Sequence, residues 1–254
     1  MLNMANESDL GSILGFCSGD LIGTRIACYC LSYGFNRDFF SVWISIFDGE
    51  IKGIVAKFYD NITVKVAEGC DIRELRDFCD MLSFNELVCD EHFSLNSGYA
   101  HAAVKKSYVF RGNADCESLR SIDEAYYKQL YSLVSQNIPG SFEDSDEAYL
   151  SWLSDFTFRN RRGLSRSKGV VENGILLSSV ITSSETENSA ILSAVATSTQ
   201  ARGKGLGRKT VMSAVNELIS ENKEVYVIAL NDSACGFYEH LGFVFAGNIH
   251  FIHY

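Results

Sequence analysis

The sequence has little proline and no long apolar stretch. It contains one proline, Pro139, among 254 residues, and no apolar run approaches the roughly 18 residues that a membrane-spanning helix needs. The first residues, MLNMANESDLGSILGF, carry acidic side chains where a secretory signal peptide needs positive charge. We therefore expect a cytoplasmic protein without a membrane partner, and the 46% hydrophobic content indicates a globular protein with a substantial core.

Positive charge is also scarce. The 22 Lys and Arg residues are outnumbered by 32 Asp and Glu residues, so the formal net charge is −10. A field of that sign repels the phosphates of nucleic acids and of anionic membranes. We therefore expect no nucleic-acid partner, although the composition still allows a local basic patch.

The usual spacings of metal and disulfide sites are missing as well. The eight cysteines are scattered, and several lie in apolar segments such as RIACYCLSYG, which is typical of buried, reduced thiols. Neither a CxxC pair nor an HExxH motif occurs. We therefore expect no structural metal.

The pattern of polar and apolar residues predicts two domains. A polar stretch at 111–118, RGNADCES, separates halves of different character. Before it, residues with helical spacing at 10–17 and 72–82 flank three strand-like runs in 41–68, which is typical of an antiparallel meander packed on helices. The predicted fold class is α/β with a mixed α+β sheet. The predicted domains are a smaller α+β domain at 1–112 and a second domain at 113–254.

The second half alternates predicted helices and strands. Amphipathic spacing indicates the helices and β-branched runs indicate the strands, and the run VYVIAL is apolar at every position, as in a strand that is covered on both faces. The predicted elements are helices at 126–134 and 149–156, strands at 163–172, 175–182 and 190–197, a helix through 211–219, a strand at 225–230, a helix at 233–241 and a final strand pair at 243–254.

The segment QARGKGLGR, at 200–208, stands between a predicted strand and a predicted helix. A strand that enters a helix through glycines leaves backbone N–H groups pointing into one concavity, which suits phosphate oxygens. Glycine lets a ligand approach the amides because it has no Cβ. Alone this pattern is weak, since glycine-rich turns often only connect elements. Positive charge gathers here in an otherwise acidic chain, at Arg202, Lys204, Arg208 and Lys209.

A second motif follows the buried strand. The segment at 231–243 reads NDSACGFYEHLGF, and the loop fits [QR]xxGxG in two frames, Gln200/Gly203/Gly205 and Arg202/Gly205/Gly207. With these motifs, residues 116–254 resemble the GNAT superfamily of acyl-CoA-dependent N-acetyltransferases. The proline and aromatic residue that usually lead into this loop are replaced here by Thr199-Gln200-Ala201. The first half is either a degenerate copy of the same fold or an unrelated accessory domain.

The resemblance implies transfer of an acetyl group from acetyl-CoA to a primary amine of a small molecule or protein. It implies that the loop amides bind the pyrophosphate and that backbone N–H groups of 195–197 stabilise the thioester oxygen. Asn231 is expected to contact the pantetheine arm, or it caps a helix. The loop cations reach phosphates or are solvated. The residues expected to bind acetyl-CoA are Val195, Ala196, Thr197, Gln200, Arg202, Gly203, Lys204, Gly205, Leu206, Gly207, Arg208 and Asn231.

Tyr238 is the expected catalytic residue. A phenol, with a pKa near 10, can protonate the departing thiolate; alternatively, Tyr238 only packs beside Phe237 and Phe243. The strand at 190–197 has no carboxylate to serve as a base, and the other candidates are all compatible with surface positions. Those candidates are Glu143, Asp144, Asp146, Glu172, His250 and His253.

Two other classes of function are alternatives to an N-acetyltransferase. A non-catalytic acyl-CoA sensor or interaction module would keep the loop without the chemistry. A P-loop nucleotide hydrolase is excluded because GKGLGRKT does not fit GxxxxGK[ST]. The acceptor amine and the oligomeric state are not defined by the sequence.

Overall fold

The chain forms two compact units. The computed structural model describes all residues except 1, 36, 100–101, 115, 139 and 254, so Pro139 and Tyr254 lie outside the described residues. The domain boundary that the sequence predicts after residue 112 stays a prediction, and the two units are defined here by which residues lie close together. The first unit comprises Met1–Tyr108, Ile228–Gly236 and Phe245–Tyr254, and the second comprises Val109–Val227 and Phe237–Val244.

The first unit contains the meander that the sequence predicts. Strands β2, β3 and β4 pair antiparallel, and β5 runs parallel to β4. The hydrophobic pattern missed α2, because ten of its 13 residues are buried and no polar face breaks the pattern. The elements are β1 (Leu2–Met4), α1 (Leu10–Phe16), α2 (Leu21–Tyr33), β2 (Phe40–Phe47), β3 (Glu50–Phe58), β4 (Asn61–Val66), α3 (Ile72–Leu82), β5 (Glu86–Asp90), α4 (Glu91–Ser97) and β6 (Ala102–Phe110).

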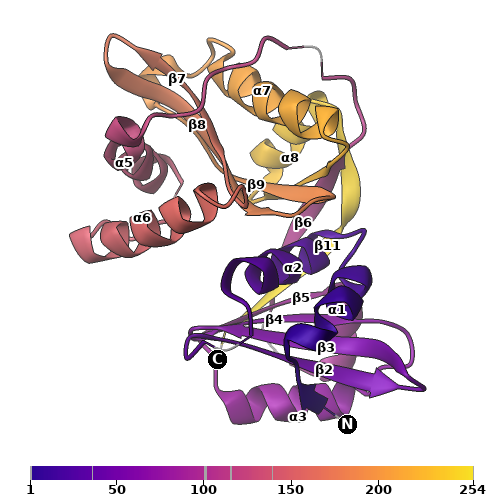
Figure 1. Cartoon of the computed structure of the whole chain (residues 1–254). Coiled ribbons are helices and arrows are strands. Elements are labelled where there is room, and N and C mark those ends of the chain that lie inside the picture. The colour runs from indigo at the N-terminus through magenta and orange to yellow at the C-terminus, as the bar shows by residue number, and fades with distance from the viewer. Residues whose placement is uncertain (1, 36, 100–101, 115, 139, 254) are drawn as a thin grey trace. The chain divides into compact units, whose positions relative to one another are not determined.

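Helices cover both faces of this meander. Helices α1 and α2 lie on one face and α3 lies on the other (Figure 1). Leu75 and Cys79 of α3 and Phe93 of α4 are fully buried against strand residues such as Val55 and Val64. The amphipathic spacing of α3 therefore places its apolar side on the sheet, as predicted.

The second unit confirms the predicted helices and strands, with ends shifted by a few residues. Strands β7, β8 and β9 are antiparallel, and β10 runs parallel to β9, so the chain is a mixed α/β protein as expected. The elements that follow β6 along the chain are η2 (Glu124–Tyr126), α5 (Tyr127–Asn137), α6 (Asp146–Asn160), β7 (Ser167–Glu172), β8 (Ile175–Glu185), β9 (Ser189–Thr197), η3 (Thr199–Ala201), α7 (Leu206–Ser220), β10 (Glu224–Ala229), α8 (Asp232–His240) and β11 (Phe243–His253). The end of β10, the first half of α8 and most of β11 belong to the first unit.

The predicted final strand pair is wrong. β11 is a single strand that continues through position 247, where glycine accommodates a φ of 145° because it has no Cβ. Its residues 249–253 pair antiparallel with β5.

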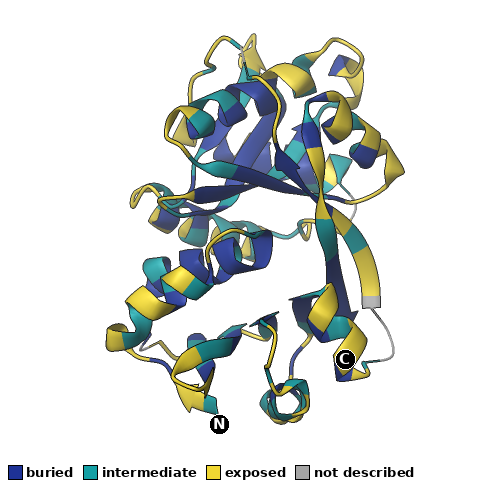
Figure 2. Ribbon diagram, turned by 90° about the vertical axis from the view of Figure 1, so that its right-hand side faces the viewer, coloured by how far each residue is buried: buried dark blue, intermediate teal, exposed yellow. Residues whose placement is uncertain are grey.

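Helices also cover both faces of strands β7 to β9, with α5 on one side and α7 on the other (Figure 1). Val211, Val215 and Leu218 of α7 are fully buried, which matches the predicted inner face. Burial is concentrated in the strands and the inner helix faces, and the exposed residues lie on loops and outer faces (Figure 2).

A buried ion network joins β7, β8 and α7. The carboxylate of Glu185, at the end of β8, is fully buried and accepts hydrogen bonds from Arg166 and Lys223. Arg166 also donates to Glu217 at 2.6 Å and to Glu221 at 2.8 Å. Each buried charge therefore has a partner, as burial of charge requires.

All eight cysteines are free thiols. In the described part of the chain, every helix is too short or too polar to cross a bilayer.

Candidate active site

β9 has a bulge in its pairing with β8 and, near its end, is no longer paired with β10. The parallel register ends at Leu192 and Val227, although β9 continues to Thr197. Ala194 has a φ of +50° and is the only non-glycine residue in the left-handed region inside a strand among the described residues. The register with β8 shifts at the same place. The backbone of 193–197 therefore has no register partner in β10. The role of Val195 to Thr197 in binding the thioester stays a prediction.

A buried hydroxyl cluster fixes the end of β9. Ser178 lies 3.0 Å from the Thr197 hydroxyl, and Thr210 of α7 donates to Ser178 at 3.1 Å. Ser178 and Thr210 are fully buried. The cluster ties β8, β9 and the first turns of α7 together, and the sequence reasoning did not identify it.

The loop after β9 presents an uncapped helix start. Gly203 and Gly205 have φ values of 76° and 77°, which other residues adopt only with strain. Gly205 precedes α7, and no side chain caps this helix, whereas Asp71 caps α3 and Ser145 caps α6. The first N–H groups of α7 therefore lack an intrachain side-chain partner, at the positive end of the helix dipole.

Gly207 serves a different purpose. A Cβ at this position would lie 3.2 Å from the Thr197 hydroxyl and 3.7 Å from Phe237. Glycine therefore lets the first turn of α7 pack closely on β9. Beside this turn is a cavity of about 230 Å³. Its lining residues are Thr197, Ala201, Arg202, Gly203, Gly205, Leu206, Gly207, Arg208 and Phe237.

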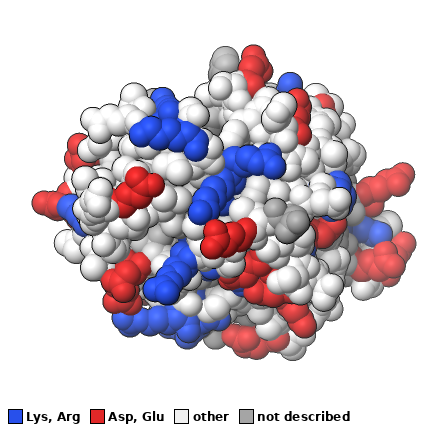
Figure 3. Space-filling view, turned by 90° about the horizontal axis from the view of Figure 1, so that it is seen from above, with Lys and Arg blue, Asp and Glu red and all other residues white. Residues whose placement is uncertain are grey.

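The loop cations differ in their partners. Arg202 donates to the Thr197 carbonyl at 3.2 Å and to Asn137 at 2.9 Å, so its side chain is engaged within the protein. Lys209 lies 3.7 Å from Glu117. Lys204 and Arg208 are exposed and have no ion-pair partner among the described residues. Acidic and basic side chains are interspersed over the face seen in Figure 3.

Tyr238 lies one residue after Phe237 on α8. Only 6% of it is exposed, and its ring packs against Phe237 and Phe243 at 5.3 and 5.5 Å between centroids. Burial raises its pKa well above the ordinary value of 10.0, so the phenol keeps its proton at neutral pH. The packing expected for a structural tyrosine is therefore present, and Tyr238 itself does not line the cavity.

Asn231 acts as a helix cap. Its side-chain oxygen accepts from the N–H of Ala234 at 3.0 Å, at the start of α8. Of the other expected ligands, Val195 and Ala196 precede the cavity on β9, while Gln200, Lys204 and Asn231 are not part of its lining.

The candidate bases are dispersed. Asp146 accepts from Lys128 at 2.6 Å, and this bond lowers the pKa of the carboxyl. Glu143, Asp144, Glu172 and His253 are exposed. His250 is buried on β11, and neither of its ring nitrogens has a hydrogen-bond partner among the described residues. None of the six lines the cavity, and within the described residues no three His, Cys, Asp or Glu side chains gather as a metal site.

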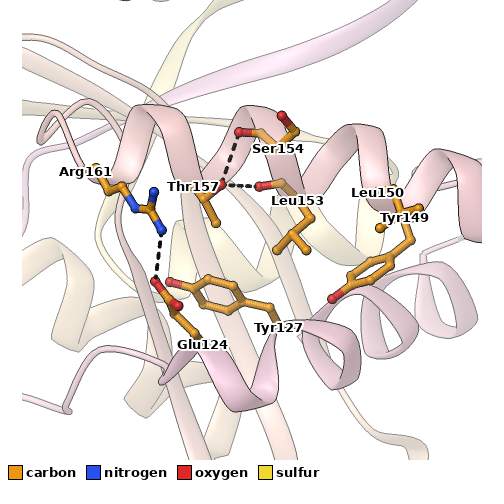
Figure 4. A pocket seen from close by; sticks show the side chains of 8 residues that line it. All are labelled: Glu124, Tyr127, Tyr149, Leu150, Leu153, Ser154, Thr157 and Arg161. Atoms are coloured by element: carbon orange, nitrogen blue, oxygen red, sulfur yellow. Dashed lines mark hydrogen bonds and ion pairs between the residues drawn. The ribbon is translucent and has the colours of Figure 1, made fainter.

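A second, larger groove of about 440 Å³ lies along α6. Tyr127, Tyr149 and Leu153 form its apolar wall, and Glu124 faces Arg161 at 4.0 Å at one end (Figure 4). Since an arginine balances the only carboxylate of its lining, the groove offers no unpaired charge to a cationic amine. It shares no lining residue with the cavity at the loop.

Comparisons with known proteins point to one fold. Residues 167–251 match the family model of the FR47-like protein. A tandem GNAT protein from the clavulanic acid biosynthesis pathway is similar over 100% of this chain and 98% of its own, with 13% identity and a TM-score of 0.65. No curated protein matches the chain.

Two further solved structures agree. A GCN5-related N-acetyltransferase from Sphaerobacter thermophilus covers 100% of this chain and 95% of its own, with 12% identity and a TM-score of 0.64. A GNAT-family acetyltransferase from Colwellia psychrerythraea covers 100% of both chains, with 12% identity and a TM-score of 0.62. The predicted GNAT-like assignment is thereby supported, and at this identity the solved structures establish the fold alone.

Proposed function

Because residues 167–251 carry a GNAT-related domain and the chain has the fold of GNAT acetyltransferases, we propose that this protein transfers the acetyl group of acetyl-CoA to a primary amine of a small molecule or peptide. The observation that carries the proposal is the uncapped start of α7 beside the end of β9 that is not paired with β10. Phe237 of α8 lines the cavity there, and the buried Tyr238 follows it in sequence.

The cavity at the loop would receive the pyrophosphate of acetyl-CoA. Backbone N–H groups at the start of α7 suit phosphate oxygens, and the helix dipole favours their charge. Lys204 and Arg208 add two exposed cations that other side chains do not neutralise. Arg202 would contribute its backbone and hold the loop through its bonds to Thr197 and Asn137.

The opened end of β9 would receive the thioester. In our proposal a backbone N–H of 195–197 donates to the thioester oxygen, which becomes negative as the amine attacks. The left-handed backbone of Ala194 supports this assignment, because a strained residue persists where the surrounding structure holds it in place. Asn231 would orient α8 from its cap position, and with it Tyr238.

The reaction would proceed by direct attack. The neutral amine nitrogen forms a bond to the carbonyl carbon and becomes positively charged, and it then releases one proton to water. The carbon–sulfur bond breaks as the tetrahedral intermediate collapses to the amide. The departing sulfur takes the proton of the Tyr238 phenol and leaves as the CoA thiol, and the phenol regains a proton from solvent. Since burial keeps Tyr238 protonated, the donor is ready before the sulfur departs.

The attacking amine must first lose a proton, because a primary amine has a pKa near 10.4. The described site has no carboxylate or imidazole in its lining, so we propose that water carries this proton to solvent. The exposed Glu143 and Asp144 near the start of α6 would attract a cationic acceptor. The free cysteines fit a reducing compartment, and we place the reaction in the cytoplasm.

The test is to incubate the purified protein with acetyl-CoA and a mixed panel of polyamines, aminosugars and lysine peptides, and to detect acetylated amines by mass spectrometry. Mass detection avoids thiol reagents, which the eight cysteines would consume. The proposal predicts an acetylated product that forms only with the protein present. Binding of acetyl-CoA without transfer to any amine would favour a sensor of acyl-CoA instead.

A further inference from the structure

The two units repeat one order of elements. In the first, the antiparallel strands β2, β3 and β4 are followed by α3, the parallel strand β5 and α4. In the second, β7, β8 and β9 are followed by α7, β10 and α8. Each position of the proposed acyl-CoA site therefore has a counterpart in the first unit, and the side chains at the two positions can be compared.

The loop before α3 is built differently from the loop before α7. It reads AEGCD, at 67–71, where the second unit has STQARGKG, at 198–205. Asp71 caps α3 by accepting from the N–H of Glu74 at 3.0 Å. Glu68 and Glu74 add two more carboxylates, against the single cation Arg73 in this first turn. A pyrophosphate here would meet repulsion and an amide that is already bonded.

The end of β4 is also occupied. The parallel pairing of β4 with β5 runs to Val64 and Cys89, and no residue of β4 has a positive φ. Lys65 comes one residue later, where the second unit has Ser193. Its ammonium donates to Asp20, and only 13% of the side chain is exposed. An ion pair therefore lies beside the strand end at which the second unit opens for the thioester.

The helix after the parallel strand lacks the phenol. Asp90 caps α4 by accepting from Phe93 at 2.9 Å, as Asn231 caps α8. Seven residues after each cap the second unit has Tyr238, and the first has Ser97, which donates to the Ser94 carbonyl at 3.2 Å.

The phenol nearest to Ser97 in the first unit's sequence is Tyr99, and it has another partner. Its hydroxyl donates to Asp80 of α3 at 2.8 Å, and its ring packs against Phe84 and Phe93. Among its described residues, the first unit therefore supplies no phenol as proton donor at the position that Tyr238 occupies in the second.

We infer that the first unit is a copy of the acyl-CoA fold whose ligand positions are filled by its own side chains, Asp71 at the helix start and the Lys65–Asp20 pair at the strand end. The full chain accordingly binds one molecule of acyl-CoA, in the second unit. This inference rests on the proposed function, because it takes the loop before α7 as the site that is filled.

Equilibrium dialysis of the full chain against radiolabelled acetyl-CoA measures the number of sites. The wild type should saturate at one molecule per chain. Gly205→Asp places a carboxylate at the start of α7, as Asp71 does at α3, and should bind none. The matched control Asp71→Asn keeps a cap in the first unit and should still bind one.

Gly205 has a positive φ, so its replacement risks misfolding. The double variant Lys204→Glu/Arg208→Glu changes only exposed side chains and should weaken binding by about tenfold for each reversed charge. Hydrogen exchange should show protection by acetyl-CoA at 198–210 and none at 66–75.

Two sites per chain, a site that survives in both loop variants, or protection at 66–75 would each overturn the inference. A wild type that binds no acetyl-CoA would contradict the proposed function itself. It would also contradict the inferred binding of one acetyl-CoA molecule per chain.

Discussion

Arg202 donates to Asn137 at 2.9 Å and to the Thr197 carbonyl at 3.2 Å, and so joins the loop before α7 to the end of α5. Asn137 in turn donates to the Leu133 carbonyl at 2.8 Å within α5. The sequence motif places an arginine here as a ligand of phosphate, while the structure gives its side chain two protein acceptors.

The first prediction concerns this link. If Arg202 acts by holding the loop, Arg202→Met and Asn137→Ala should each weaken acetyl-CoA binding by a similar factor of about 3 to 10, the size of one hydrogen bond. The double variant should be no worse than Arg202→Met alone, because that substitution already removes the bond to Asn137. Isothermal titration of the four proteins checks this. If the losses of acetyl-CoA affinity add in the double variant, and Arg202→Met loses more than Asn137→Ala, then Arg202 instead contacts the phosphates.

The second prediction concerns Ala194. Its φ of +50° costs an alanine about 1 kcal/mol, so Ala194→Gly should stabilise the protein by about that amount. Ala194→Val should destabilise it and lower kcat, because a β-branched residue resists this backbone and shifts the opening of β9. Asn173→Val is the control, since Asn173 has the same φ in the exposed turn between β7 and β8. Urea unfolding measures the effect on stability, and the rate of acetyl transfer measures the effect on kcat. If Asn173→Val lowers kcat as much as Ala194→Val does, the proposed role of the bulge is contradicted.

The third prediction concerns the buried ion network. Arg166→Met should lower the free energy of unfolding by about 3 kcal/mol, because the fully buried Glu185 loses the hydrogen bonds that Arg166 donates and keeps Lys223 and the Thr182 hydroxyl as partners. Arg161→Met removes an exposed arginine 4.0 Å from Glu124 and should cost below about 1 kcal/mol. Urea unfolding at pH 7 compares the two. Equal losses would mean that burial of Glu185 does not set the strength of the network.

The same network sets a dependence on pH. Hydrogen bonds from Arg166 lower the pKa of Glu221 from 4.5 to about 2. A carboxyl whose pKa is lower in the folded state stabilises the protein above its unfolded pKa, and this stability is lost as the pH falls from 4.5 towards 2. The stability difference between wild type and Arg166→Met should therefore narrow over this interval. A difference that stays constant on acidification would show that Arg166 does not act through these carboxylates.

The local pattern of the chain predicted most of the second unit. Glycines next to the start of α7 and the apolar run of β10 are local signals, so periodicity and turn chemistry were sufficient there. The pattern of apolar residues did not predict α2, because most of its surface is buried. It predicted a strand pair at 243–254, where the structure has the single strand β11.

Two features of the candidate site could not be predicted from the sequence. The backbone of Ala194 follows from the register between β8 and β9, and the contacts of Ser178 with Thr197 and Thr210 join residues far apart in the chain. Such features depend on pairing between distant segments, which no local pattern of residues encodes.

The most direct test of the proposal that Tyr238 protonates the departing sulfur is the turnover of Tyr238→Phe with saturating acetyl-CoA and a reactive amine. Removal of the phenolic hydroxyl should lower kcat by about 100-fold or more, while the affinity for acetyl-CoA stays the same. Tyr226→Phe is the matched control, because Tyr226 is equally buried and its hydroxyl donates to Glu224 at 2.6 Å, away from the opening. Full turnover in Tyr238→Phe would contradict the account.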